Sequence, residues 1–167
     1  LEFRRVLFRS LNFRFSIKRS PHVNFFIQKV NIPSINLVSP NYPNPFVKAP
    51  IPGEHLDYGT LEITYKVDED LQNYLEIYNW IVALGKPENY DQYKTIQDKL
   101  PASGDGIYSD ITLMVLSSTK MANYEIVFSD AFPVSVSPIV FNTTDTDVNY
   151  IEGSATFKYT LFNINNI

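Results

Sequence analysis

The segment from Thr60 to Gly85 reads TLEITYKVDEDLQNYLEIYNWIVALG, and the spacing of its apolar residues changes partway along. Over residues 60–67 apolar and polar residues alternate, which is typical of a half-buried β-strand because successive side chains point to opposite faces. From Leu71 onward the apolar residues recur at the spacing of one face of an α-helix. The segment therefore predicts a strand that leads directly into a helix.

The ends of this helix are marked by residues with known end preferences. Asp68 is a plausible N-cap, and Glu69 and Asp70 suit the positive end of the helix dipole. Gly85, followed by Pro87, is expected to end the helix. The face turned to the core is predicted to carry Leu71, Tyr74, Leu75, Tyr78 and Ile81.

Strand-like alternation dominates the rest of the chain. A short second helix is expected within 90–100, and Val134–Phe141 is expected to be an edge strand because Pro138 interrupts it. The longest alternation is Tyr150–Phe162, which predicts one long closing strand. The other predicted strands are 12–19, 25–32, 111–117 and 124–128. About seven strands and one helix predict a mainly β (α+β) fold, an antiparallel β-sandwich or partial barrel with one flanking α-helix.

One stretch, from Val38 to Gly53, differs from its surroundings because it holds five of the chain's 11 prolines. Proline fixes the backbone and donates no hydrogen bond, so we expect a stiff, extended loop that cannot pair as a central strand. Long loops of this kind tend to be functional. The loop also carries apolar Phe46, Val47 and Ile51, which predicts a contact with another subunit. A passive connector is the alternative.

Chain length and the first ten residues bear on domain organisation. A chain of 167 residues is long enough for one domain with a real core. Residues Leu1 to Ser10, LEFRRVLFRS, match the in-frame translation of a common short-read sequencing adapter, and they lack the apolar region of a signal peptide. We therefore expect residues 1–10 to be foreign and residues 11–167 to form a single domain.

The charge of the chain argues against nucleic-acid binding. Setting the decapeptide aside removes three arginines and one glutamate, so the formal net charge of −4 becomes −6. Affinity for DNA comes mainly from lysine and arginine that displace counterions, and the remaining sequence holds no cluster of them. We expect no tight binding to DNA.

No pattern in the sequence predicts catalysis, a cofactor or a metal site. His55 and Asp57 could share a metal, but no second histidine or cysteine is near them. Asp145 and Asp147 resemble half of a calcium loop without its glycine and distal glutamate. The sequence contains no nucleophile elbow, no phosphate-binding loop and no apolar run of the roughly 18 residues that would span a membrane. We predict a protein that is not an enzyme.

The order of these segments resembles that of the tail-tube family of contractile-tailed bacteriophages, which includes tube-like baseplate and tail-end subunits. The resemblance covers about residues 13–164 and rests on a shared order of strand pair, long loop, strand, helix and strands. It is carried by FRFSIKR, VNIPSI, IPGEHLDYGTLEITYKVDED, YLEIYNW, SDITLMVLSS, VFSDAFPVSVSPIVF and VNYIEGSATFKYTLFNI.

The resemblance implies a structural virion protein, assembled in the host cytoplasm without a membrane. Its subunits would form rings, hexameric by resemblance, in which sheets join edge to edge around a channel. The rings would stack into a tube, contact tail sheath and baseplate proteins, and let DNA pass without tight binding. Exposed strand edges are an aggregation hazard unless assembly uses them, which agrees with this interpretation.

A second class of function stays open at this point: a carbohydrate- or receptor-binding β-sandwich. Trp80 and the tyrosines of the predicted helix could form a platform on which sugar rings stack. Aromatic residues at helical spacing more often belong to a core, so the sequence favours the structural interpretation.

Overall fold

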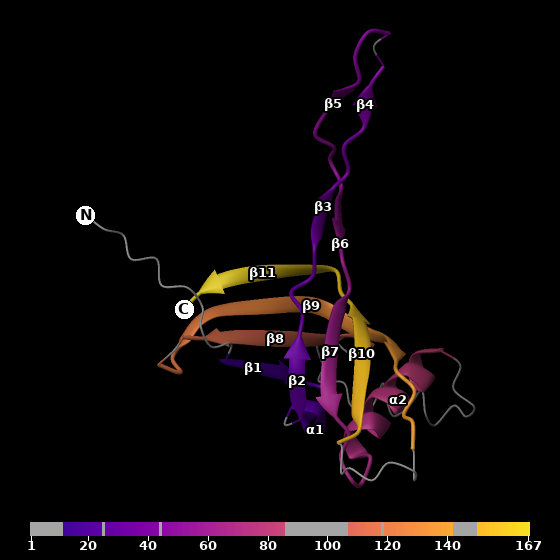
Figure 1. Cartoon of the computed structure of the whole chain (residues 1–167), viewed down its shortest axis with the longest axis vertical. Coiled ribbons are helices and arrows are strands. Elements are labelled where there is room, and N and C mark those ends of the chain that lie inside the picture. The colour runs from indigo at the N-terminus through magenta and orange to yellow at the C-terminus, as the bar shows by residue number, and fades with distance from the viewer. Residues whose placement is uncertain (1–11, 25, 44, 86–106, 118, 142–149) are drawn as a thin grey trace.

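The computed structural model describes residues 12–24, 26–43, 45–85, 107–117, 119–141 and 150–167 (Figure 1). The predicted foreign decapeptide, the helix expected within 90–100 and the aspartate pair Asp145 and Asp147 lie outside the described residues.

Two antiparallel sheets share one long strand and form the body of the molecule. Sheet A has the order β1-β8-β9-β11 and sheet B the order β2-β7-β10-β9, so the described strands do not close into a barrel. The strands of sheet A run across those of sheet B in Figure 1. The bounds are β1 Asn12–Ile17, β2 Ile27–Val30, β7 Leu61–Lys66, β8 Ser109–Leu116, β9 Ala122–Val136, β10 Glu152–Lys158 and β11 Leu161–Asn166. The predicted mainly β fold with a flanking helix is confirmed.

Strand β9 passes from one sheet to the other, which corrects the prediction of two strands in this region. Its first part pairs with β8 and β11, and its last residues pair with β10. Between the two parts Asp130 has a φ of 55°, a left-handed conformation that aspartate tolerates better than most residues. The strand ends at Val136, so the edge strand predicted over residues 134–141 was wrong beyond that residue.

The closing segment also changes sheets, which corrects the prediction of a single strand over 150–162. The chain turns at Tyr159 and Thr160, leaving sheet B as β10 and entering sheet A as β11. The buried positions shift by one residue at this corner, from Ala155 and Phe157 in β10 to Phe162 in β11, so a single alternation does not describe both strands. The rings of Phe128, Tyr159 and Phe162 pack at this corner, with centroids 5.0–5.9 Å apart.

The hydrophobic core lies between the two sheets, and the strand registers align its residues in layers across sheet A. Ile17, Ile111, Phe128 and Phe162 form one layer, and Phe15, Leu113 and Ile126 form the next, which ends at the exposed Ile164. From sheet B, Tyr65 and Phe157 are fully buried in the same core.

Among the described residues, helices α1 (Pro21–Asn24) and α2 (Gln72–Gly85) flank the sheets. Helix α2 packs on sheet B through Trp80, whose ring lies 6.2 Å from that of Phe157. Gly85 is its last residue, as predicted. No described helix is long and apolar enough to cross a membrane.

The predicted inner stripe of α2 was wrong by one helical position. The buried residues are Asn73, Ile77, Trp80 and Ala83. Leu75 and Tyr78 are exposed, Leu71 and Tyr74 are partly buried, and Ile81 alone of the predicted stripe packs against the core.

The reason for this error is a polar residue at a core position. The buried Asn73 side chain donates to the Lys66 carbonyl (2.7 Å) and accepts from the Tyr74 amide (2.8 Å). A buried amide that is hydrogen-bonded costs little, but hydrophobicity alone assigns it to the outer face. Assigning Tyr74 instead of Asn73 to the core rotates the expected face by about 100°, the turn per residue of an α-helix.

Candidate assembly surfaces

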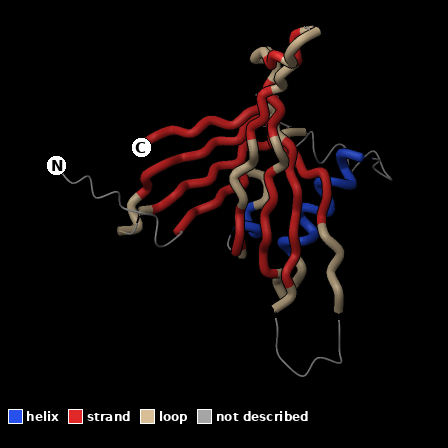
Figure 2. Tube along the Cα trace, turned by 45° about the horizontal axis from the view of Figure 1, so that its top comes forward, coloured by secondary structure: helices blue, strands red, loops and turns tan. Residues whose placement is uncertain are grey.

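A two-stranded arm projects from the body between β2 and β7 (Figures 1 and 2). In the arm, β3 (Ile35–Leu37) pairs with β6 (Leu56–Tyr58), and β4 (Asn41–Tyr42) pairs with β5 (Ala49–Pro50). The stiff, extended loop expected over residues 38–53 is therefore part of a hairpin, in which none of its described residues belongs to a central strand. Prolines are compatible with this structure because a two-stranded ribbon has only edge strands, which need fewer backbone donors than a central strand.

Hydrogen bonds outside the two short ladders connect the strands of the arm. The Val38 amide donates to the His55 carbonyl (3.2 Å), and the Ile51 amide donates to the Pro40 carbonyl (3.0 Å). Gly53 packs so closely on the Val38 carbonyl that a Cβ atom at this position would collide with it. The arm is thus an ordered hairpin rather than a flexible connector.

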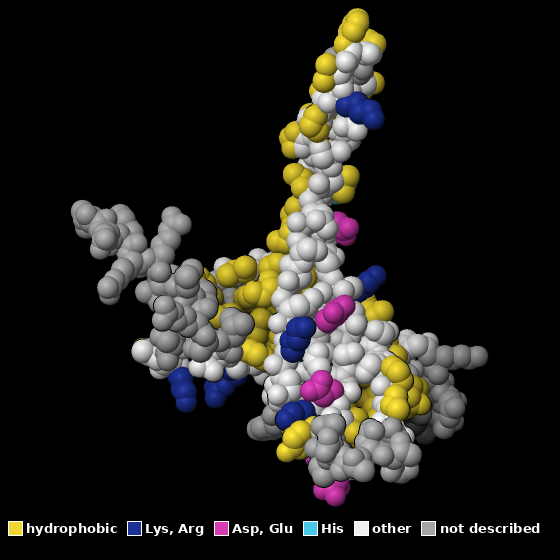
Figure 3. Space-filling view, viewed as in Figure 1, with side chains coloured by type: hydrophobic (Ala, Val, Ile, Leu, Met, Phe, Trp, Pro, Cys, Tyr) yellow, Lys and Arg dark blue, Asp and Glu magenta, His cyan; other side chains and the backbone are white. Residues whose placement is uncertain are grey.

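Apolar side chains cover much of the arm (Figure 3). Phe46, Val47 and Ile51, the residues predicted to contact another subunit, are 91%, 65% and 43% exposed. The other large exposed apolar residues of the arm are Ile35, Leu37, Val38, Tyr42 and Leu56. An exposed apolar surface of this extent typically marks an interaction site.

The outer edge of β1 forms a second candidate surface. The Ile17 amide and carbonyl both bond to Asn24, on the side away from β8. Backbone groups of alternate residues in a strand point to the same edge, so those of Phe13 and Phe15 also face away from β8. An open groove of about 430 Å³ lies along this edge, lined by Asn12, Phe13, Arg14, Phe15, Asn24, Ile27 and Leu116.

The outer edge of β11 is the third surface. The Ile167 amide donates to the Asn123 carbonyl of β9, so odd-numbered residues of this segment turn their backbone groups inward. Phe162 and Ile164 consequently present theirs to the outer edge. Within the described ranges, no strand pairs with the outer edge of either β1 or β11.

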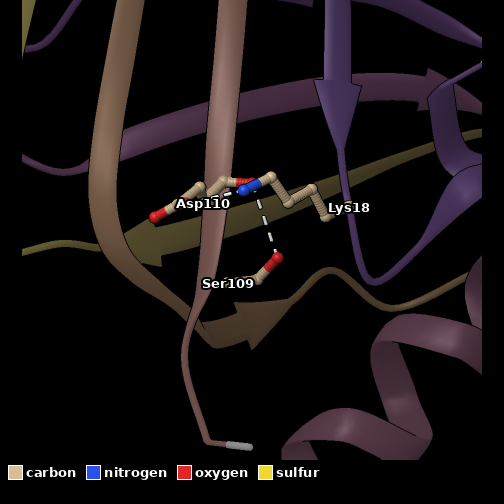
Figure 4. Close-up of polar contacts among 3 residues, drawn as sticks. All are labelled: Lys18, Ser109 and Asp110. Atoms are coloured by element: carbon tan, nitrogen blue, oxygen red, sulfur yellow. Dashed lines mark hydrogen bonds and ion pairs between the residues drawn. The ribbon is translucent and has the colours of Figure 1, made fainter. Parts of the chain in front are cut away.

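The face of sheet A that points away from the core is polar and nearly neutral. Two of its charged residues, Arg14 and Glu125, lie on either side of Met114 in the strand register. A third, Asp110, forms an ion pair with Lys18 at the end of β1, with 2.9 Å between Nζ and Oδ2 (Figure 4). The Lys18–Asp110 pair is exposed, so it adds little to stability. Strands β7 and β10 lie in sheet B, so their polar faces do not extend this surface.

The groups considered for other chemistry occupy structural positions. Trp80 is buried and its indole Nε1 donates to the Ile107 carbonyl (3.2 Å), so it offers no platform for a sugar. His55 and Asp57 belong to the arm, and among the described residues no three histidine, aspartate or glutamate side chains are placed to hold a metal. Burial raises the pKa of the Tyr65 hydroxyl to about 12, as expected for a neutral core residue.

Two of these surfaces were not predicted as sites. The sequence indicated that edges exist, but not that β1 and β11 are the two edges of one sheet, because strand order depends on contacts between distant segments. No pattern in the sequence indicated Asn24, since an asparagine in a short segment that begins with a proline is most often a turn residue.

Comparison with known proteins agrees with this architecture. No protein-family model matches the chain. A relative, the tail tube terminator protein of Enterobacteria phage T4, is 29% identical over 166 residues, covering 92% of this chain and 86% of its own.

Two solved structures show the same fold. A chain of the extracellular contractile injection system PVC sheath/tube terminator in the extended state is 15% identical, covers 92% of both chains and has a TM-score of 0.58. A chain of the anti-feeding prophage baseplate, determined with six-fold symmetry, is 13% identical, covers 96% of this chain and 94% of its own, and has a TM-score of 0.57. These similar proteins are structural components of tails and injection systems, not enzymes, and the likeness supports the tail-tube-like family that the sequence resembles.

Proposed function

We propose that this chain forms rings that build or close the end of a phage tail tube. The observation that carries the proposal is the construction of sheet A. Its order β1-β8-β9-β11 is antiparallel throughout and ends in two open edges. With an even number of antiparallel strands, the last strand of one copy lies antiparallel to the first strand of a copy in the same orientation.

The two edges also match in side-chain direction. The residues whose backbone groups point outward, Phe13 and Phe15 on β1 and Phe162 and Ile164 on β11, all share the core-facing side of sheet A. Residues directly opposite each other in a sheet have side chains on the same face. Joining β11 of one copy to β1 of the next would therefore continue both the hydrogen-bond ladder and the core.

Such a contact uses different surfaces on the two copies, and head-to-tail contacts close into rings when the rotation permits. The six-fold symmetry of the baseplate relative supports a ring of six. In the ring the arm, through Phe46, Val47 and Ile51, would dock on a neighbouring copy or on the next ring. Its ordered hairpin reduces the entropy lost on docking.

The same arrangement implies a channel lined by the polar face of sheet A. With opposite charges balanced on that face, the wall would let DNA pass without holding it, since tight binding needs an excess of lysine and arginine. Sheath and baseplate proteins would contact the outside of the ring, as expected for a component of a contractile tail.

Negative-stain electron microscopy of the purified protein tests the proposal. We expect rings or short tubes from the parent chain and none from Ile164→Pro, which removes an outward-facing donor without touching the β9 ladder. Ile164→Ala keeps the donor and should still form rings. Monomers from the parent chain, or rings from Ile164→Pro, would contradict edge pairing, and tight glycan binding by such a monomer would support a carbohydrate-binding module instead.

A further inference from the structure

Asn24 occupies a position on the outer edge of β1 that a neighbouring strand would otherwise take. Its Oδ1 accepts from the Ile17 amide (2.8 Å), and its Nδ2 donates to the Ile17 carbonyl (3.3 Å). In an antiparallel sheet, two opposite residues exchange this same pair of hydrogen bonds. The side chain of Asn24 thus replaces the backbone of one residue of a partner strand.

We infer that Asn24 is a positioning residue that sets the register in which β11 of a second copy pairs with β1; this rests on the ring contact proposed above. Ile17 already has its two hydrogen bonds, so an added strand can pair only from Phe15 towards Asn12. The groove along β1 is lined by these residues and by Asn24, so the Asn24 side chain borders the space that an added strand would enter.

The strand that we expect to pair with β1 is β11 of the second copy. Its outer edge runs antiparallel to β1, and its outward-facing residues have side chains on the same face of the sheet as those of β1. Two registers would place its outward-facing residues opposite Phe13 and Phe15. In the first, Phe162 lies opposite Phe15 and Ile164 opposite Phe13. In the second, Ile164 lies opposite Phe15, and Phe162 falls opposite Ile17, where Asn24 is bound.

The first register is therefore the one that Asn24 permits. It also covers Ile164, which is 56% exposed in the isolated chain, with the partly buried ring of Phe13. The second register would place Asn166 opposite Phe13, a poorer match for an apolar side chain. Burial and the blocked position thus favour the same pairing.

Disulfide cross-linking measures the register directly, because the chain has no cysteine of its own. Arg14→Cys with Asn163→Cys reports the first register, and Arg14→Cys with Asn165→Cys reports the second. All three side chains are exposed on the polar face of sheet A. The two registers differ by ~7 Å along the strand, beyond the reach of a disulfide, so we expect at least about tenfold more cross-linked product from the first pair.

Asn24→Ala should then raise cross-linking of the second pair in assembled rings, because the position opposite Ile17 becomes open. Asn24→Asp, which retains an acceptor for the Ile17 amide, is the conservative variant, and it should keep more of the first register. Melting curves confirm that each variant is folded.

The possible outcomes distinguish an error in the proposed register from an error in the proposed ring. Rings in which the second pair cross-links more than the first contradict the inference, even if Asn24→Ala fails to fold. Rings in which Asn24→Ala folds and leaves the cross-linking ratio unchanged contradict the role of Asn24 alone. Rings without either cross-link contradict β1–β11 pairing, and the absence of rings from the parent chain contradicts the proposed function itself.

Discussion

The body and the arm of this chain use apolar side chains in opposite ways. In the body, Phe128 is fully buried at the corner where the two sheets meet. In the arm, Phe46 is 91% exposed on a hairpin that contributes no residue to the core except the partly buried Tyr58 at its base. From this comparison we expect the body to fold without the arm, and we expect the exposed surface of the arm to be buried only by a second molecule.

Replacing each of these phenylalanines by alanine compares the most buried and the most exposed of them in their effects on stability and assembly. Phe128→Ala should lower the free energy of unfolding by about 3–5 kcal/mol, because it opens a cavity in a packed core. Phe46→Ala should change it by less than about 0.5 kcal/mol, as for other surface substitutions, yet reduce assembly. Denaturant unfolding and electron microscopy of both variants check this. A large loss of stability from Phe46→Ala would mean that the arm belongs to the core.

The two faces of α2 give a second matched pair. Ile77→Ala should cost about 2–5 kcal/mol, because Ile77 is fully buried against the core. Leu75→Ala, on the opposite face, should cost less than about 0.5 kcal/mol because Leu75 is 41% exposed. Thermal unfolding of the two variants measures the difference. Equal losses would show that the helix is rotated from the orientation described here.

The arm itself can be removed without a core substitution. Replacing residues 38–53 by a short glycine-serine linker should leave the melting temperature of the monomer nearly unchanged and abolish rings or tubes. Calorimetry reports the first property and electron microscopy the second. If this variant forms normal tubes, the arm is only a connector. If the variant does not fold, the body depends on the arm for its stability.

The smallest expected effect concerns a polar atom inside the body. The Tyr65 hydroxyl is buried without a hydrogen-bond partner among the described residues, and burial raises its pKa to about 12 from 10.0. A raised pKa means that the folded state favours the neutral phenol, so stability is retained below pH 10 and falls as the pH rises through 12. Tyr65→Phe should weaken this alkaline loss and change stability at pH 7 by less than about 1 kcal/mol. Melting temperatures between pH 8 and 12, with Tyr42→Phe on the exposed arm as the control, check both points. An unchanged alkaline profile would contradict the assignment.

The contrast between the body and the arm also explains which features could be predicted from the sequence. Alternation at Ile63, Tyr65, Ile111 and Leu113 located strands whose one face is buried, because that face must be apolar in any arrangement. The corners at Asp130 and Tyr159 could not be predicted, since they depend on which sheet the chain enters next. The inner face of α2 was misassigned because Asn73 reaches its partners only in the folded chain. Phe46, Val47 and Ile51 were recognised as unusual because nothing local accounts for apolar residues in a proline-rich segment.

The central claim, that β11 of one copy pairs with β1 of the next, is tested most directly by an electron cryomicroscopy reconstruction of the assembled protein. The account predicts that sheet A continues across each subunit boundary, with β11 antiparallel to β1 and the Asn24 side chain at the end of the shared ladder. Rings whose subunits meet through other surfaces, with the outer edges of β1 and β11 open to solvent, would contradict it.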